Sequence, residues 1–172
     1  MHCTKCPLHR TRHTVVFGVG NPRAALMFIG EAPGADEDRQ GEPFVGRAGK
    51  LLTKTLEELG TPRSEVYIAN ILKCQPPGNR VPLPPEVASC LPYLRKQIDL
   101  IRPKLLCALG GVAAKTLLQS EATISSLRGR IHPFGNHRLF PTFHPAYILR
   151  NPAELPRFRE DLRTAIGLAT KP

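Results

Sequence analysis

Four short apolar runs, separated by stretches with helical periodicity, limit most strongly what this chain can fold into. The runs are 25–29, 66–69, 104–109 and 139–143, and each is followed by a glycine or a polar residue. Such runs are typical of parallel strands that are buried on both faces of a sheet. Pro141, inside the last run, either weakens that assignment or places the strand at an edge of the sheet.

Stretches with helical patterns lie between and after these runs. They are 51–59, which precedes Gly60, 84–101, which two prolines open, and 112–118 and 154–168. The segments 31–49 and 74–85 are rich in Gly and Pro and are expected to be loops. Alternating strands and helices predict an α/β three-layer sandwich with a central four-stranded, mostly parallel sheet and helices on both faces. Because the chain has no repeat and no long linker, residues 1–172 are expected to form a single domain.

Polar residues or glycines follow all four predicted strands. They are Glu31 one residue after the glycine that ends the first run, Asn70 after the second, Gly110 after the third and His144 after the fourth. In open α/β sheets, ligands bind beyond the carboxyl ends of the strands. We therefore expect a carboxylate, an amide, a glycine turn and an imidazole to converge on one candidate site.

The charge balance favours a polyanionic partner without proving one. The chain carries 24 Lys and Arg against 14 Asp and Glu, a net charge of +10. Basic proteins attract nucleic acid through counterion release, but this excess is spread along the chain and equally suits a basic protein with no such partner. The sequence has neither an apolar signal-peptide core nor an apolar run of ~20 residues, so a cytoplasmic protein without membrane association is expected.

The five cysteines in the chain are not expected to form disulfides in a reducing compartment. Cys3 and Cys6 form a C-x-x-C pair, and with Cys74 and Cys90 they allow a four-thiolate site for zinc or an iron–sulfur cluster. This spacing does not choose the metal, and Cys90 also fits the apolar stripe of its helix as a core residue. Cys107, in the middle of a predicted strand, is expected to be an ordinary core residue.

Three segments resemble family 4 uracil-DNA glycosylases, the iron–sulfur type. They are Gly-Glu-Ala-Pro-Gly at 30–34 with its continuation to Gly49, the His-Pro-Ala-Tyr segment at 144–152, and Asn70 with Lys73-Cys74 and the Pro-rich loop. The resemblance implies an enzyme that hydrolyses the N-glycosidic bond of uracil in DNA, single- or double-stranded, and acts as a monomer. It also implies a [4Fe–4S] cluster with Cys3, Cys6, Cys74 and Cys90 as ligands.

The resemblance assigns roles to site residues, each of which also has a purely structural reading. Glu31 would hold the attacking water or stabilise the sugar cation, and His144 would donate a hydrogen bond to uracil O2. Phe44 would stack on the flipped base, although a loop Phe is usually core. Asn70 would accept from uracil N3–H and donate to O4, a pattern that cytosine reverses, although an Asn at a strand end can simply satisfy a turn. Ala32 would also line the substrate pocket, with Glu37 excluding the methyl group of thymine.

DNA contacts are expected from two further places. Leu149 and Arg150 are predicted in a loop that could fill the space left by a flipped nucleotide, although Leu149 could equally be core. Gly110 and Lys115 could meet a phosphate at a helix N-terminus, and a plain strand-to-helix turn is the alternative. His132 and His137 are expected to be structural loop residues.

Three rival interpretations remain. A related branch reacts covalently with uracil-DNA through a histidine in an inserted basic loop, but the interval 74–90 contains no histidine. Another branch lacks an acid in the first motif, where this chain has Glu31. A zinc-stabilised nucleic-acid-binding module without catalysis would explain the charge and the cysteines, but not the convergence of Glu31, Asn70 and His144.

Overall fold

The computed structural model describes residues 2–170 and contains a six-stranded sheet in the order β1-β3-β2-β4-β6-β5. The strands are β1 (Val19–Gly20), β2 (Leu26–Gly30), β3 (Tyr67–Asn70), β4 (Leu105–Leu109), β5 (His132–Phe134) and β6 (His137–Thr142). The inner strands β2, β3, β4 and β6 are parallel, and the edge strands β1 and β5 pair antiparallel. Residues 1, 171 and 172 of the expected domain lie outside the described residues.

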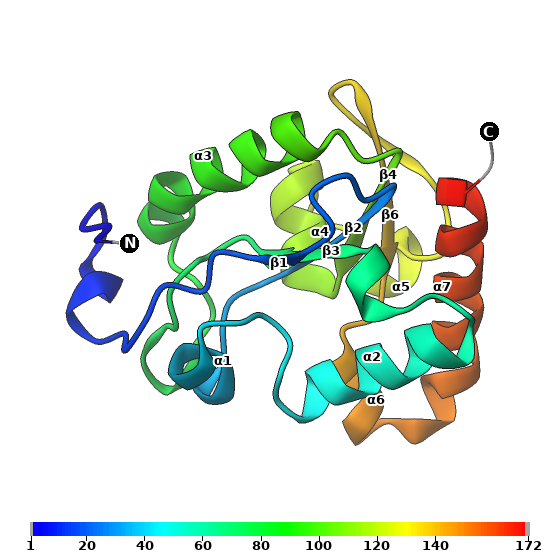
Figure 1. Ribbon diagram of the computed structural model, residues 1–172, viewed down its shortest axis with the longest axis horizontal. Coiled ribbons are helices and arrows are strands. Elements are labelled where there is room, and N and C mark those ends of the chain that lie inside the picture. The colour runs from blue at the N-terminus through cyan, green and yellow to red at the C-terminus, as the bar shows by residue number, and fades with distance from the viewer. Residues whose placement is uncertain (1, 171–172) are drawn as a thin grey trace.

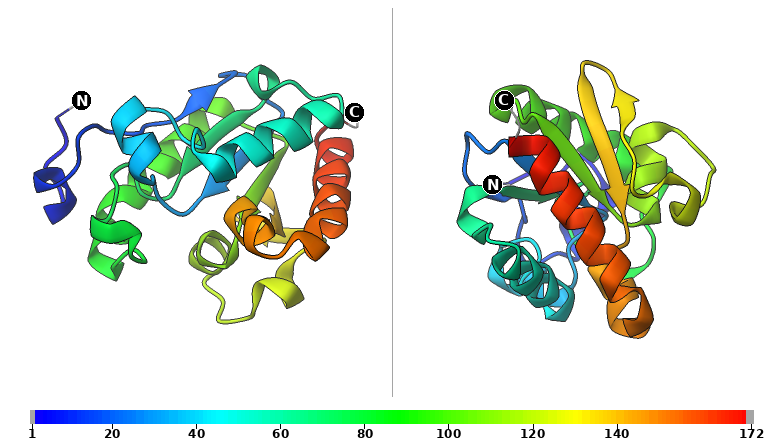
Figure 2. Two further views of the ribbon diagram at one scale, coloured as in Figure 1. Left: turned by 90° about the horizontal axis from the view of Figure 1, so that it is seen from below. Right: turned by 90° about the vertical axis from the view of Figure 1, so that its right-hand side faces the viewer.

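Helices cover both faces of the sheet (Figures 1 and 2). They are α1 (Ala35–Gln40), α2 (Arg47–Glu58), α3 (Pro84–Ile101), α4 (Gly111–Leu118), α5 (Ile124–Leu127), α6 (Pro145–Arg150) and α7 (Leu155–Thr170). Short 3-10 segments are η1 (Pro7–Arg10), η2 (Arg63–Glu65), η3 (Pro77–Asn79) and η4 (Pro152–Glu154). Alternate residues of the inner strands pack against α3 and α4 on one face and against α2, α6 and α7 on the other. The predicted α/β three-layer architecture is confirmed.

The predicted count of four strands is wrong, because β1 and β5 complete the sheet at its two edges. These strands have only two and three residues, too few to carry a periodic signal. Their sequences, Val-Gly and His-Pro-Phe, are also not the apolar runs that mark the inner strands. Edge strands are often short, which limits pairing with another chain.

Pro141 lies in β6, which is flanked by β4 and β5 and is not the edge strand. The pairing of β5 ends at Leu139, and the Pro141 carbonyl, facing that side, accepts from Gly129 N at 3.0 Å. The nitrogen of a strand residue faces the same side as its carbonyl. Pro141 therefore removes no hydrogen bond from the β4–β6 ladder.

Three segments predicted as loops contain regular structure. Residues 35–40 form α1, which begins after Gly34 and ends at Gly41 with φ 78°. Leu149 and Arg150 end α6, and His132 and His137 belong to the β5–β6 hairpin. All three elements have six residues or fewer, which is too short for a clear hydrophobic period.

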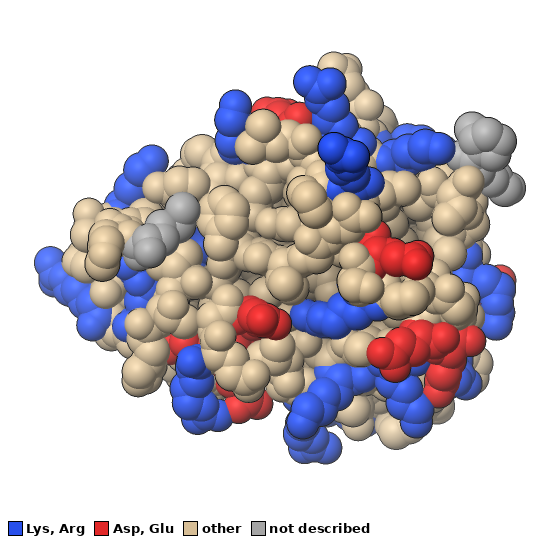
Figure 3. All heavy atoms as spheres, viewed as in Figure 1, with Lys and Arg blue, Asp and Glu red and all other residues tan. Residues whose placement is uncertain are grey.

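Within residues 2–170, no helix is both long and apolar enough to cross a membrane. Lys and Arg side chains are distributed around the face shown in Figure 3 and do not gather in one block. On this face the positive charge therefore does not mark a binding site by itself.

Candidate active site

A cleft of about 660 Å³ opens at the carboxyl ends of the parallel strands. Seven of the residues singled out from the sequence line it: Glu31, Ala32, Glu37, Phe44, Asn70, His144 and Arg150. They come from the end of β3 and from the segments after β2 and β6. The expected convergence of Glu31, Asn70 and His144 is confirmed, but the fourth expected member, Gly110, does not line the cleft.

Asn70 is buried on the cleft wall, and its side-chain oxygen has no hydrogen-bond partner among the described residues. It is 2% exposed, and its Oδ1 is the single buried side-chain polar atom without a hydrogen-bond partner within residues 2–170. A Cβ placed on Gly30 would lie 2.4 Å from Asn70 Oδ1 and 2.6 Å from the Phe44 ring, so only glycine fits there. An unpaired buried acceptor typically costs ~1–3 kcal/mol, which a donor on a ligand can recover.

Phe44 lies in the loop between α1 and α2 in an unusual backbone conformation. Its φ is 54°, and the side chain is 6% exposed, with the ring centroid 5.6 Å from that of His144. The Glu37 carboxylate holds this loop by accepting from Val45 N at 2.9 Å and Gly46 N at 2.8 Å. Glu37 thus has a structural task that the sequence did not reveal, in addition to facing the cleft.

His144 is the N-cap of α6, and its ring is held in one tautomer. Its φ and ψ of −74° and 137° are extended, as expected before Pro145. The Nδ1 atom accepts from Ala146 N at 3.1 Å, so the neutral ring carries its proton on Nε2. Burial and, to a lesser extent, the Arg150 charge lower the pKa of His144 to about 4, although the Glu37 charge opposes the shift. His144 is therefore a neutral hydrogen-bond donor at physiological pH.

Glu31 directly follows β2 and is partly buried on the cleft wall. No residue within 2–170 donates a hydrogen bond to its carboxylate, and burial raises the pKa of Glu31 above its usual value. A raised pKa and unused acceptor oxygens are the properties expected of a group that binds or activates water.

The remaining sequence candidates do not line the cleft. A Cβ on Gly110 would lie 2.8 Å from His144 Cβ, but the Gly110 N–H donates to Thr142 O at 2.9 Å and is not available to a phosphate. Lys115 Nζ lies 3.9 Å from the carboxylate of Glu121. Leu149 is 38% exposed on the last turn of α6, next to the cleft residue Arg150.

Sequence reasoning missed one wall of the cleft. Pro76, Asn79, Arg80 and Val81, from the Pro-rich loop, line it together with Arg47 at the start of α2. Arg80 is held by Glu86, which is 3% exposed, through hydrogen bonds of 2.6 and 2.9 Å. The density of Pro and Gly marked this segment as a loop, but its place beside Asn70 depends on the path of the chain from β3 to α3.

Comparison with known proteins agrees with this geometry. Residues 17–166 match the description "Uracil DNA glycosylase superfamily". A type-4 uracil-DNA glycosylase from Thermotoga maritima is 48% identical over 87% of this chain and 79% of its own length. Type-4 enzymes from Archaeoglobus fulgidus and Pyrobaculum aerophilum are each 43% identical, over 95% and 96% of this chain and 86% and 89% of their own.

The chain belongs to the type-4 uracil-DNA glycosylases. The resemblance found in the sequence motifs is thereby confirmed. The match begins before β1 and ends within α7, so the cleft lies within the part of the chain that matches the superfamily.

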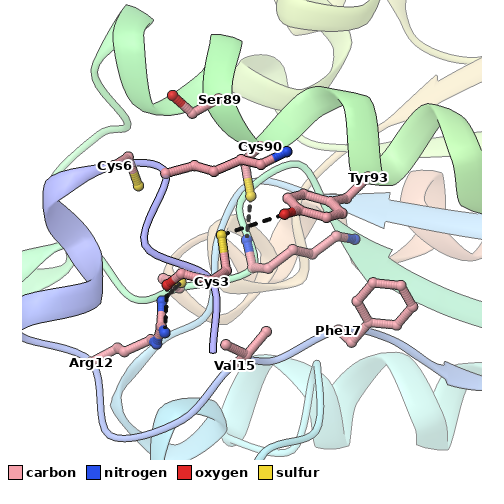
Figure 4. Close-up of a pocket in the computed structure, with 11 residues that line it drawn as sticks. Cys3, Cys6, Arg12, Val15, Phe17, Ser89, Cys90 and Tyr93 are labelled. Atoms are coloured by element: carbon pink, nitrogen blue, oxygen red, sulfur yellow. Dashed lines mark hydrogen bonds between the residues drawn. The ribbon is translucent and has the colours of Figure 1, made fainter. Parts of the chain in front are cut away.

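Four of the five cysteines of this type-4 chain line one small cavity. Cys3, Cys6, Cys74 and Cys90 surround it, and Figure 4 shows the Cys3, Cys6 and Cys90 sulfurs pointing into it. Three of the four sulfurs accept hydrogen bonds: Cys74 Sγ from Arg12 Nη1 at 3.2 Å, Cys90 Sγ from Lys73 N at 3.2 Å, and Cys3 Sγ from Tyr93 Oη at 3.6 Å. Donors of this kind are the ones that surround the sulfurs of iron–sulfur clusters.

Cys107 is separated from this cavity by the sheet. It is fully buried in β4 and packs in the cluster with α2 and α7, whereas Cys74 and Cys90 belong to the cluster on the opposite face. Its position agrees with its expected role as a core residue.

Lys73 connects the cysteine cavity with the cleft, which the sequence did not predict. Its Nζ donates to Asn70 O at 2.9 Å and to Gln97 Oε1 at 2.6 Å, while its backbone N–H bonds Cys90. Burial lowers the pKa of Lys73 to about 7. One buried residue therefore contacts both the Asn70 backbone and a wall of the cysteine cavity.

Proposed function

We propose that this chain is a monofunctional glycosylase that hydrolyses the N-glycosidic bond of uracil in DNA, as a step of base excision repair. The observation that carries the proposal is the unpaired Asn70 Oδ1 at the cleft wall. The N3–H of a flipped uracil would supply the missing donor, and Asn70 Nδ2 would donate to uracil O4. Cytosine presents an acceptor at N3, so it would leave the buried oxygen unpaired.

The chemistry uses groups on two sides of the bound base. Phe44 stacks on the uracil ring, and His144 Nε2–H donates to O2, where negative charge develops as the bond breaks. The Glu31 carboxylate orients the attacking water and stabilises the positive charge on the sugar. No lysine lines the described cleft, so an amine nucleophile for a combined glycosylase and lyase reaction is not at hand.

DNA contacts surround the cleft. Arg150 reaches the phosphates near the flipped nucleotide, and Leu149, exposed beside it, is placed to fill the vacated space in a stack. Ala32 and Glu37 line the base pocket, where Glu37 would exclude the thymine methyl group. Lys115 would act as a secondary phosphate contact from outside the cleft, whereas the Gly110 N–H already donates to Thr142 O. A monomer with a single domain is sufficient for this arrangement.

The cysteine cavity fits a [4Fe–4S] cluster bound by Cys3, Cys6, Cys74 and Cys90. Four thiolates can hold either a zinc ion or an iron–sulfur cluster, and the type-4 family to which the chain belongs favours the cluster. Cys3, Cys6, Cys74 and Cys90 would be the ligands, because all four line this one cavity. The cluster supplies a structural crosslink, which ties the N-terminal segment to the Pro-rich loop and α3.

The direct test of function is incubation with uracil-containing oligonucleotides without added metal, followed by detection of abasic sites. We expect abasic sites in both single- and double-stranded oligonucleotides that contain uracil. We expect none in matched oligonucleotides that contain cytosine or thymine in its place. A nucleic-acid-binding module without catalysis would bind both and release no base.

Removing any one cluster ligand should bleach and destabilise the protein. We expect serine substitutions of Cys3, Cys6, Cys74 and Cys90 each to lower the visible absorption and the melting temperature, because each thiolate closes part of the crosslink. Cys107→Ser is the matched control and should keep the colour. Loss of colour in that variant, with colour retained in Cys90→Ser, would contradict the ligand set.

Asn70→Asp should reduce uracil excision roughly ten- to hundredfold, because its carboxylate cannot donate to uracil O4. The protonated acid can pair with cytosine, so some cytosine release is expected at low pH. Single-turnover rates on matched uracil and cytosine oligonucleotides measure both effects. An unchanged rate on uracil would show that Asn70 does not read the base.

A further inference from the structure

The stacking side chain Phe44 depends on a backbone conformation that its own residue type disfavours. Its φ of 54° lies in the left-handed region, which is strained for a non-glycine residue and persists only where the surroundings enforce it. Gly49 packs so closely against it that a Cβ there would lie 1.9 Å from the Phe44 carbonyl. The conformation therefore has to be held by contacts from outside the loop.

Two side chains hold the loop from opposite ends. The Glu37 carboxylate binds the N–H groups of Val45 and Gly46, on the C-terminal side of Phe44. On the other side, Arg63 Nη2 donates to Pro43 O at 2.5 Å, while Nη1 donates to Thr53 Oγ1 in α2 at 3.2 Å.

Arg63 is well placed to do this, and the nearby Glu37 and Glu42 charges attract it without forming a salt bridge among the described residues. It begins η2, the turn that leads into β3 and so to Asn70. It does not line the cleft, and it forms no salt bridge with a carboxylate in the described part of the chain. Its two side-chain hydrogen bonds go to the Phe44 loop and to the helix that follows that loop.

We propose that Arg63 is a positioning residue, which holds the Pro43–Phe44 segment in the conformation that stacks on the flipped base. This inference rests on the proposed function, because it assigns Arg63 an effect that acts through Phe44. It also explains why a partly buried guanidinium binds a backbone carbonyl. The two Nη atoms of the planar guanidinium group can bind the loop and α2 at the same time.

A double-mutant cycle with Phe44→Ala tests the inference. We expect Arg63→Met to lower the single-turnover rate about tenfold when Phe44 is present, because a charged hydrogen bond is lost. In the Phe44→Ala background the same change should have an effect of about twofold or less, because the side chain that Arg63 positions is gone. A residue that only stabilises the fold would slow both backgrounds equally.

Binding provides a second measurement that does not need turnover. The affinity for DNA with a non-hydrolysable deoxyuridine analogue should weaken with Arg63→Met only when Phe44 is present. Arg95→Met, an exposed arginine on α3, controls for the loss of positive charge and should leave affinity nearly unchanged. If Arg63→Met does not fold, Arg63→Gln is run through the same cycle, since its shorter side chain loses the charged donor to Pro43 O but stays polar.

The outcomes separate this inference from the proposed function. Equal losses in both backgrounds, or no loss in either, would overturn the role of Arg63. Failure of the unmodified protein to release uracil would overturn the proposed function instead, and the binding cycle would still report on Arg63.

Discussion

We expect Glu31→Gln to lower the single-turnover rate of uracil excision by about 10²–10⁴ while the affinity for uracil-DNA stays nearly unchanged. The amide retains the size of the carboxylate but can neither take a proton from water nor stabilise the sugar cation. The measurement is rapid-quench excision with enzyme in excess, together with binding of DNA that carries a non-hydrolysable deoxyuridine analogue. Weaker binding with an unchanged rate would place Glu31 outside the chemistry.

The pH profile of the unmodified protein provides the control for this variant. Burial raises the pKa of Glu31, so the active carboxylate is lost as the pH falls through a value above the usual 4.5. His144, with a pKa of about 4, stays neutral over that interval and does not contribute to the loss. The rate should therefore fall on the acid side above pH 4.5 in the unmodified protein, and Glu31→Gln should remove this limb.

His144→Ala should lower the single-turnover rate by about 10²–10³, the usual effect of losing one donor to a developing oxyanion. His144 Nδ1 is occupied by Ala146 N–H, so Nε2–H is the only ring donor, and alanine removes it. His144→Asn is a matched variant, because its amide can still donate, and it should retain part of the rate. Since Glu31 and His144 serve one transition state, the double variant need not be slower by the product of both effects.

The two catalytic variants together decide the site. Wild-type single-turnover rates in both Glu31→Gln and His144→Ala, on DNA that is well bound, would refute the proposed active site. That result would leave the fold and the family membership intact, because neither depends on these two side chains.

The inner sheet and most of the cleft could be predicted from the sequence for a physical reason. Strands buried on both faces need uninterrupted apolar runs, and parallel connections return each carboxyl end to the same edge. Residues immediately after such runs must therefore meet, as Asn70 and His144 do. The helices α2, α3, α4 and α7 could also be predicted from the sequence, because each is long enough to show its apolar stripe.

Short or non-local features could not be predicted. The strands β1 and β5 and the helices α1 and α6 are too short to show a period, and they form because neighbouring elements supply partners. The Pro-rich loop forms a wall of the cleft, and Lys73 forms hydrogen bonds with residues on both sides of it. Both features bring together segments whose distance in space cannot be read from their order in the chain.

The sequence by itself determined the α/β class, the positions of the inner strands and the set of polar residues at their carboxyl ends. Only the tertiary structure decided which side of the sheet each cysteine faces, and so why Cys107 is separated from the other four. It also decided that Asn70 Oδ1 is left unpaired, that His144 carries its proton on Nε2, and that Arg63 holds the Phe44 loop. Hydrogen bonding and burial of single atoms depend on contacts between distant segments, and no local pattern in the chain encodes them.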